Sequence, residues 1–313
     1  MVWRSRQFRL WSITLGSSLL VLTTVAGLVS DRVTLPAALA GTVAPPAQVA
    51  NAERLKPLYG ADIVYLGETH TSPADHVAQL EILEALYAKN PQLAIGMEMF
   101  QRPFQTVLDE YLAGTITEAE LVQRSDYDRR WGFPWEYYAP ILRFAKAKQL
   151  PVIALNAPAE VTRKVAREGL DGLTAADFRD IPDRAQLDTS NANYRRFVLS
   201  AFDSHAAHGN FNVDHFFAAQ VVWDETMAQS IATFRRANPR TQVVVLAGQG
   251  HVVYGYGIPD RVARRLGRSL NQKIVLLNPP PDLNAAAETA IADLLWYSAS
   301  PLDAGAAPQN TGD

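Results

Sequence analysis

The fold is decided by the stretch Ile63-Val64-Tyr65-Leu66-Gly67-Glu68-Thr69-His70, in which an apolar run ends on polar residues that can do chemistry. Such a run is typical of a strand buried on both faces. Similar runs occupy residues 93–97, 152–155, 243–247 and 274–277, with helical stretches between them. Strands that alternate with helices predict an α/β fold, with a core sheet of parallel strands flanked by helices.

Two long stretches interrupt this alternation after the second and third strands. Residues 101–149 hold helices and many aromatic side chains, and residues 157–238 are mainly helical. Both stretches leave from the carboxyl ends of their strands, where ligands bind in open parallel sheets. We therefore expect a large helical insertion that caps these ends as a lid.

Composition excludes several classes of site. The 313-residue chain has no cysteine, which rules out thiolate metal sites, disulfides and a lipid anchor on cysteine. Its formal net charge is −3 and no long basic run follows the N-terminal region, so nucleic-acid binding has no support. With 48% hydrophobic residues, the chain can bury a sizeable core.

The N-terminal segment has the pattern of a targeting signal. Arg4, Arg6 and Arg9 precede an apolar stretch at residues 10–29, and Ala38-Leu39-Ala40 follows it. This order predicts a secretory signal that is cut after Ala40, or an uncleaved anchor. We expect an exported protein, periplasmic or associated with the cell envelope.

The remaining boundaries follow from composition. Residues 1–40 are the signal or anchor, 41–51 a linker, 52–298 the folded domain and 299–313 a disordered tail.

Four ionisable side chains stand at or just after the ends of the predicted strands. They are Glu68, His70, Glu98 and His251. Because parallel strands end at the same edge of a sheet, we expect these side chains to meet. As acid–base groups, Glu68, His70 and Glu98 could be catalytic. All four could instead bind a divalent metal such as zinc, manganese or iron.

Other residues suit a larger cofactor. Tyr254 and Tyr256 follow His251 in a glycine-rich stretch, and tyrosine and histidine both ligate haem iron. Gln220 and Asp224 fall on or beside the apolar stripe of a predicted helix at residues 214–237, so we expect both to reach the same site.

The segment at residues 127–138 holds six aromatic side chains. Such a patch can stack on a planar ligand such as a porphyrin, with Arg129 and Arg130 placed to meet its carboxylates. The alternative is a hydrophobic anchor that holds the insertion on the sheet.

Six segments together resemble the ChaN family, the haem-binding uptake branch of the superfamily that includes Tiki, TraB and erythromycin-esterase-like proteins. They are residues 66–70 (LGETH), 96–103 (GMEMFQRP), 131–135 (WGFPW), 154–158 (ALNAP), 219–227 (AQVVWDETM) and 250–259 (GHVVYGYGIP). The resemblance runs from about residue 52 to 280. It implies an exported haem-binding protein, dimeric, whose partners include a component of haem uptake in the envelope.

The wider superfamily implies a second function. Its metal-dependent hydrolases pair a G-x-x-H motif with a glutamate and a later G-H, which correspond here to Gly67/His70, Glu98 and Gly250/His251. Two hypotheses therefore stand: haem binding with His251, Tyr254 or Tyr256 as the iron ligand, and metal-dependent hydrolysis of a peptide or ester. Members of the haem branch are often lipoproteins, a point on which this cysteine-free chain departs from the family.

Overall fold

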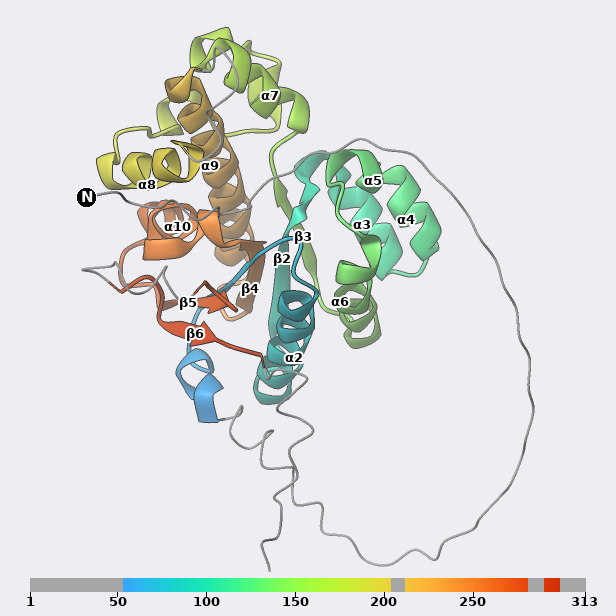
Figure 1. The fold of residues 1–313 in the computed structure, drawn as a ribbon. Coiled ribbons are helices and arrows are strands. Elements are labelled where there is room, and N and C mark those ends of the chain that lie inside the picture. The colour runs from blue at the N-terminus through green and yellow to red at the C-terminus, as the bar shows by residue number, and fades with distance from the viewer. Residues whose placement is uncertain (1–52, 204–211, 281–289, 299–313) are drawn as a thin grey trace, which may run out of the picture. The chain divides into compact units, whose positions relative to one another are not determined.

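The computed structural model describes residues 53–203, 212–280 and 290–298 (Figure 1). The expected signal or anchor, the linker and the C-terminal tail therefore lie outside the described residues. Within the described part of the chain, no helix has the length and apolar character needed to cross a membrane.

The described residues form one sheet of parallel strands in the order β3-β2-β4-β1-β5-β6, which confirms the predicted α/β class. The strands are β1 (Ile63–Glu68), β2 (Leu93–Gln101), β3 (Val152–Asn156), β4 (Gln242–Gly248), β5 (Gln272–Leu277) and β6 (Leu294–Trp296). Strand β2 runs past its apolar stretch, so Glu98 lies inside a strand rather than after one. Strand β6 was not predicted, because three residues are too short for a periodic signal.

The centre of the sheet is a topological switch point. From β2 the chain moves outward to β3 on one side, whereas from its neighbour β4 it passes β1 to reach β5 and β6 on the other. Strands β1 and β4 are neighbours, and Glu68 pairs with Gly248 at their carboxyl ends. Ligand sites in open parallel sheets lie at such a point.

Helices cover both faces of the sheet (Figure 1). Along β1, Val64 and Leu66 face one core, whereas Ile63 and Tyr65 face the other. The first core is closed by α2 (Pro73–Lys89), α3 (Gln105–Leu112), α4 (Glu118–Arg124), α5 (Tyr127–Arg130) and α6 (Trp135–Lys148). The second is closed by α9 (Val213–Ala237) and α10 (Ile258–Leu266).

The second insertion adds a smaller core of its own. In it, α7 (Ala159–Glu168) packs against the N-terminal half of α9 through Val161, Val165 and Val222. The next helix, α8 (Ala192–Asp203), packs on α9 through Tyr194 and Val198. In Figure 1, α7 and α8 lie towards the carboxyl ends of the strands, where the sequence predicted a lid.

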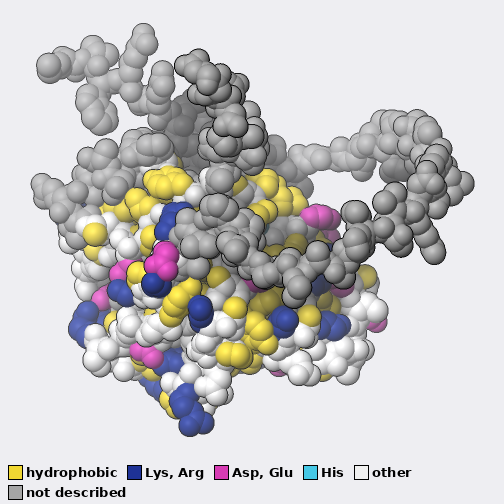
Figure 2. Space-filling model, turned by 90° about the horizontal axis from the view of Figure 1, so that it is seen from below, with side chains coloured by type: hydrophobic (Ala, Val, Ile, Leu, Met, Phe, Trp, Pro, Cys, Tyr) yellow, Lys and Arg dark blue, Asp and Glu magenta, His cyan; other side chains and the backbone are white. Residues whose placement is uncertain are grey.

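Local sequence explains where the two site-bearing helices begin. Ser72 caps α2 by accepting a hydrogen bond from the Asp75 backbone N–H, and Pro73 occupies the first turn. Asn212 caps α9 in the same way, through Asp214 and His215. On the face seen in Figure 2, lysines and arginines are scattered among hydrophobic side chains and form no single patch among the described residues there.

We expect Gly257→Ala to destabilise the protein by about 1–3 kcal/mol, because a Cβ at Gly257 would lie 2.2 Å from the carbonyl oxygen of His251. Gly250→Ala is the matched control from the same turn, since nothing lies within 4 Å of the position that a Cβ would take there. Denaturant unfolding followed by circular dichroism measures both. Equal stability of the two variants would contradict the close approach at Gly257.

Candidate functional site

The carboxyl ends of β1, β2 and β4 bring two histidine–carboxylate pairs together around Gly248. His70 Nδ1 lies 2.7 Å from Glu68 Oε1, and His251 Nε2 lies 3.4 Å from Glu98 Oε1. The Gly248 backbone N–H donates to Glu98 Oε2 at 2.7 Å. A Cβ on Gly248 would come within 2.9 Å of His70 Nε2. Only glycine therefore lets the His70 ring lie against this strand end.

Glu68 is buried and its carboxylate is surrounded by donors. Tyr138 donates its phenolic hydrogen to Oε1 at 2.6 Å, and the Gln79 side-chain amide donates to Oε2. His76 Nδ1 lies 3.6 Å from the same Oε2. Its Nε2 lies 3.2 Å from the His70 carbonyl oxygen. This network fixes the carboxylate, and through it the orientation of the His70 ring.

His70 has the largest exposed side-chain fraction of the four ionisable residues, at 11%. Its ring packs edge-on against Trp131 at 4.8 Å and against Phe133 at 5.0 Å between centroids. Burial lowers the pKa of His70, but the hydrogen bond to Glu68 and the charge of Glu98 outweigh it and raise the pKa above its usual value. Glu68 and His70 thus form an acid–base pair at the edge of the cluster.

His251 lies between two carboxylates. Its Nδ1 is 2.7 Å from Asp224 Oδ1, and its Nε2 faces Glu98. Burial alone would lower the pKa of His251, but Glu98 and then Asp224 raise it to about 10. Burial would raise the pKa of Glu98, but the charge of His251, its hydrogen bond and the charge of His70 bring it down to about 2. The three side chains form a buried triad of one imidazolium and two carboxylates.

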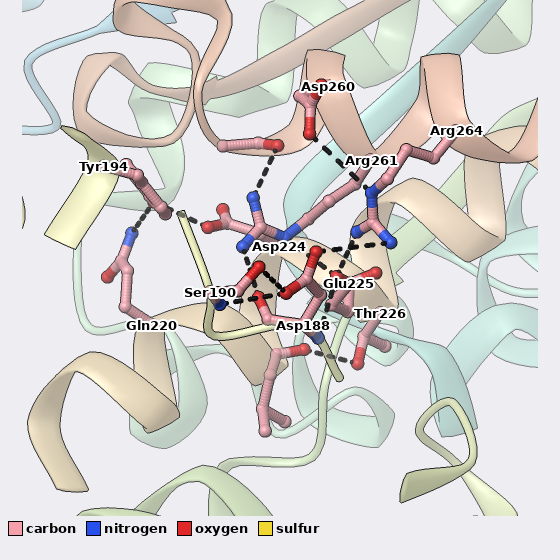
Figure 3. Close-up of polar contacts among 12 residues, drawn as sticks. Asp188, Ser190, Tyr194, Gln220, Asp224, Glu225, Thr226, Asp260, Arg261 and Arg264 are labelled. Carbon is pink, nitrogen blue, oxygen red and sulfur yellow. Dashed lines mark hydrogen bonds and ion pairs between the residues drawn. The ribbon is translucent and has the colours of Figure 1, made fainter. Parts of the chain in front are cut away.

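Helix α9 supplies the outer side of this triad, as expected from its apolar stripe. The Gln220 amide nitrogen lies 3.0 Å from His251 Nδ1 and donates to the Tyr194 phenol at 3.1 Å. Tyr194 in turn donates to Asp224 Oδ2 at 2.6 Å (Figure 3). Asp224 is therefore shared between His251 and Tyr194, which holds α8 to the site.

This donor set does not fit a divalent metal. Both ring nitrogens of His251 face carboxylates of the chain, and the Glu68 oxygens already accept hydrogen bonds from Tyr138 and Gln79. Among the described residues, no group of three His, Asp or Glu side chains is arranged to hold a metal ion. The predicted set of Glu68, His70, Glu98 and His251 as metal ligands is therefore not supported.

Tyr254 and Tyr256 stand on the turn that follows the triad, at residues 249–257. Their rings stack, with centroids 5.2 Å apart and planes 25° apart, and Phe197 packs edge-on against Tyr254 at 5.8 Å. The Tyr254 backbone has φ 57°, a left-handed conformation that is strained for a bulky residue. Both side chains are partly exposed, and neither phenol donates a hydrogen bond to a described residue.

Arg129 and Arg130 already pair with carboxylates of the chain. Arg129 Nε donates to Asp126 at 2.7 Å, and its side chain is largely exposed. Arg130 Nη2 lies 3.0 Å from Glu160, and its Nη1 donates to Gln101 at 2.8 Å. Among the described residues no contact joins either arginine to the tyrosine turn, and their contact with a haem carboxylate stays a prediction.

The aromatic segment divides between two roles. Tyr127 and Tyr138 are buried in the first core, which agrees with the hydrophobic-anchor alternative. Trp131 and Phe133 are partly exposed and line His70. Contact of these rings with a porphyrin stays a prediction.

Sequence reasoning missed Tyr138, Gln79, His76 and Tyr194. Gln79 is buried on the face of α2 that also buries Ile82, Leu83 and Leu86, a signal like the one that singled out Gln220, so it could have been found. Tyr138 and Tyr194 carry no such signal, since a buried tyrosine in a helix is an ordinary core residue.

Comparison with known proteins finds a matching family and several relatives. The family model described as haem-binding uptake, Tiki superfamily, ChaN, matches residues 54–262. The curated protein RETICULATA-RELATED 5, chloroplastic, from Arabidopsis thaliana is 30% identical over 268 residues, which cover 78% of this chain and 35% of that protein. The chain thus spans about a third of the length of this relative.

Among solved structures, ChaN of Campylobacter jejuni, described with cofacial haem binding, has a TM-score of 0.57 at 20% identity. The match covers 72% of this chain and 85% of that one, and it supports the same fold. An erythromycin esterase, EreC, in its open conformation aligns with a TM-score of 0.43 at 16% identity over 72% of each chain, too distant to carry an argument.

The triad predicts a specific pH dependence. Because the folded-state pKa of His251 is raised to about 10, its stabilisation is complete below about pH 6.5 and is lost as pH rises through 10. We expect Asp224→Asn to lower this pKa and so to reduce the loss of unfolding free energy between pH 7 and 10.

Histidine NMR titration together with denaturant unfolding measures both effects. Asp214→Asn, an exposed change on the same helix, is the control. An unchanged His251 titration in Asp224→Asn would contradict the triad.

Proposed function

The chain belongs to the ChaN family of haem-binding uptake proteins in the Tiki superfamily, and on that premise we propose that it binds haem through the turn at residues 249–257. The observation that carries the proposal is the stacked pair of Tyr254 and Tyr256, partly exposed on a strained turn. Strained, over-determined backbone is concentrated at ligand sites.

The residue types on this turn fit haem. A tyrosine phenolate is an established axial ligand of haem iron, and the ring of Phe197 offers an apolar wall beside Tyr254. His251 fits less well as an iron ligand, because it is buried and both ring nitrogens face carboxylates. Haem, when bound, supplies an iron centre, and the chain would supply a phenol oxygen from Tyr254 or Tyr256 to hold it.

Between the two phenols, the backbone favours Tyr254. Its left-handed conformation and the hydrogen bond from its N–H to the Ile291 carbonyl at 2.9 Å fix the direction in which its side chain leaves the turn. The Tyr256 ring lies beside the buried Tyr194 ring, with 6.4 Å between their centroids. We therefore assign Tyr254 as the iron ligand and Tyr256 as the ring stacked on it.

Export, a role in iron or haem uptake, an envelope partner and dimer formation are finer parts of the same proposal. They rest on the family and on the N-terminal pattern of Arg4, Arg6, Arg9 and Ala38-Leu39-Ala40. We propose that the protein handles haem outside the cytoplasm, in the periplasm or at the envelope.

Hemin titration tests the ligand assignment. We expect wild-type protein to give a Soret band, and Tyr254→Phe to weaken binding by about tenfold or more, since it removes the only atom of that side chain able to ligate iron. Tyr297→Phe, a change at an exposed tyrosine outside the turn, is the matched control. The assignment fails if Tyr254→Phe and Tyr256→Phe both bind hemin with the affinity and spectrum of wild type.

Expression of the full chain in a Gram-negative host tests export. We expect the protein in the periplasmic or envelope fraction, with a mature N-terminus at Gly41 if the signal is cut after Ala40. Intact mass and fractionation measure this. Replacing Arg4, Arg6 and Arg9 with glutamate should retain the protein in the cytoplasm, and uncut protein found only in the cytoplasm in the wild type would contradict the proposal.

A further inference from the structure

Two neighbouring carboxylates of α9 hold the two ends of the haem-binding turn. Asp224 and Glu225 are both fully buried, and successive residues on a helix point in different directions. Asp224 pairs with His251, near the start of the turn. Glu225 pairs with Arg261, four residues beyond its end, with its Oε1 3.2 Å from Arg261 Nε. Two adjacent residues of α9 therefore form ion pairs with residues on both sides of the segment that carries Tyr254.

Arg261 also contacts the turn directly. Its side chain is 2% exposed, and its Nη1 donates to the Tyr256 carbonyl at 2.7 Å and to the Gly257 carbonyl at 3.1 Å. Its Nη2 donates to the Asp188 carbonyl at 3.3 Å. Figure 3 shows this guanidinium between Glu225 and a backbone carbonyl. Only the planar, forked donor set of arginine can serve a carboxylate and several carbonyls at once.

Tyr194 of α8 connects the Asp224–His251 pair with the Glu225–Arg261 pair. Its phenol donates to Asp224, and its ring lies under the guanidinium of Arg261, 5.2 Å from Cζ. Tyr194 is fully buried, so both contacts are shielded from water. The Asp224–His251 pair, the Glu225–Arg261 pair and α8 therefore form one connected network, of which Figure 3 shows the part around Tyr194, Asp224, Glu225 and Arg261.

The remaining contacts of Glu225 show that Arg261 has a distinct role. Glu225 also pairs with Arg264 and, at 2.7 Å, with Arg265. Within the described part of the chain, neither of these arginines has a hydrogen bond to the carbonyls of the turn. Arg264 and Arg265 can therefore neutralise Glu225 without Arg261. The hydrogen bonds to the Tyr256 and Gly257 carbonyls, in contrast, come from Arg261.

The backbone of the turn needs such support. Tyr254 and Gly255 have consecutive positive φ angles of 57° and 71°. A non-glycine residue in this region costs on the order of 1–3 kcal/mol and persists only where its surroundings over-determine it. Without the carbonyl cap after the turn, Tyr254 can relax to negative φ, which would redirect its phenol.

We propose that Arg261 is a positioning residue for haem ligation, which holds Tyr254 in its strained conformation and so sets the direction of the phenol oxygen. The inference rests on the proposed function, because it concerns the same turn. It assigns a binding role to a buried ion-pair network that would otherwise be counted as support for the fold alone.

Hemin binding by Arg261 variants of the full chain tests the proposal. We expect Arg261→Met to weaken hemin binding by about tenfold or more, and to change the visible spectrum at saturating hemin because the iron ligand is misdirected or lost. We expect Arg261→Lys, which keeps the charge beside Glu225 but loses the fork, to fall between wild type and Arg261→Met. The saturated spectrum is the decisive measurement, since a protein that is merely less stable but folded would keep the wild-type spectrum.

Arg264→Gln is the matched control, because it removes an arginine from Glu225 without touching the turn. It should keep both the affinity and the spectrum of wild type. If Arg261→Met does not fold, Arg261→Lys and Tyr194→Phe decide, the latter removing the hydrogen bond to Asp224 and the one from Gln220 while keeping the ring beside Arg261. Wild-type affinity and spectrum in every folded variant of Arg261 and Tyr194 would overturn the proposal.

Tyr254→Phe in the same series separates this inference from the proposed function. If Tyr254→Phe loses the spectrum while the Arg261 variants keep it, the haem site stands and the positioning role is wrong. If wild-type protein gives no Soret band with hemin, the proposed function and the positioning role are both wrong.

Discussion

The buried triad of Asp224, His251 and Glu98 is the interaction on which the site depends. It joins α9, the segment after β4 and strand β2, three parts of the chain that no local sequence signal connects. Taking three charges out of water is costly, and removing one member of such a group leaves an uncompensated buried charge worth about 3–5 kcal/mol. A group of this kind is weak evidence for stability, but its geometry is narrowly defined. It therefore places α9 and the turn at residues 249–257 in one register relative to the sheet.

The topology explains why this triad lies where it does. Strands β2 and β4 are neighbours whose connections leave in opposite directions, and sites in open parallel sheets lie outside the carboxyl ends of such a pair. Gly248 ends β4 and lets the His70 ring approach on one side, while its N–H donates to Glu98 on the other. The same glycine thus separates an acid–base pair at the edge of the cluster from a charged triad that is closed to solvent. The first can exchange protons with its surroundings, and the second serves to hold its parts in place.

The sequence predicts those parts of this arrangement whose signals lie close together along the chain, and it does not predict contacts between distant residues. The strands, the parallel sheet and the family resemblance were predicted from runs and motifs that are local in sequence, and they are confirmed. The gathering of Glu68, His70, Glu98 and His251 could be expected from strand ends alone. What the sequence could not predict is which atom faces which, and that decides between a metal site and an ion triad. The role of Arg261 was also invisible, since an arginine in a helix near the surface is ordinary until its carbonyl partners are known.

This fold offers two different kinds of site: a buried cluster of charged residues, and a partly exposed turn that carries two tyrosines. The charged residues at the strand ends are occupied with one another, whereas the aromatic rings of Tyr254, Tyr256 and Phe197 meet on the adjacent turn, where we propose that haem binds. A strained turn needs a rigid base, and buried ion pairs supply rigidity even where they add little net stability. The histidine and glutamate motifs and the tyrosine turn would then act together: the cluster fixes the backbone, and the turn presents the ligand. In this arrangement the Glu68 carboxylate and His251 Nδ1 are engaged in hydrogen bonds within the chain, which fixes the backbone segments that carry them.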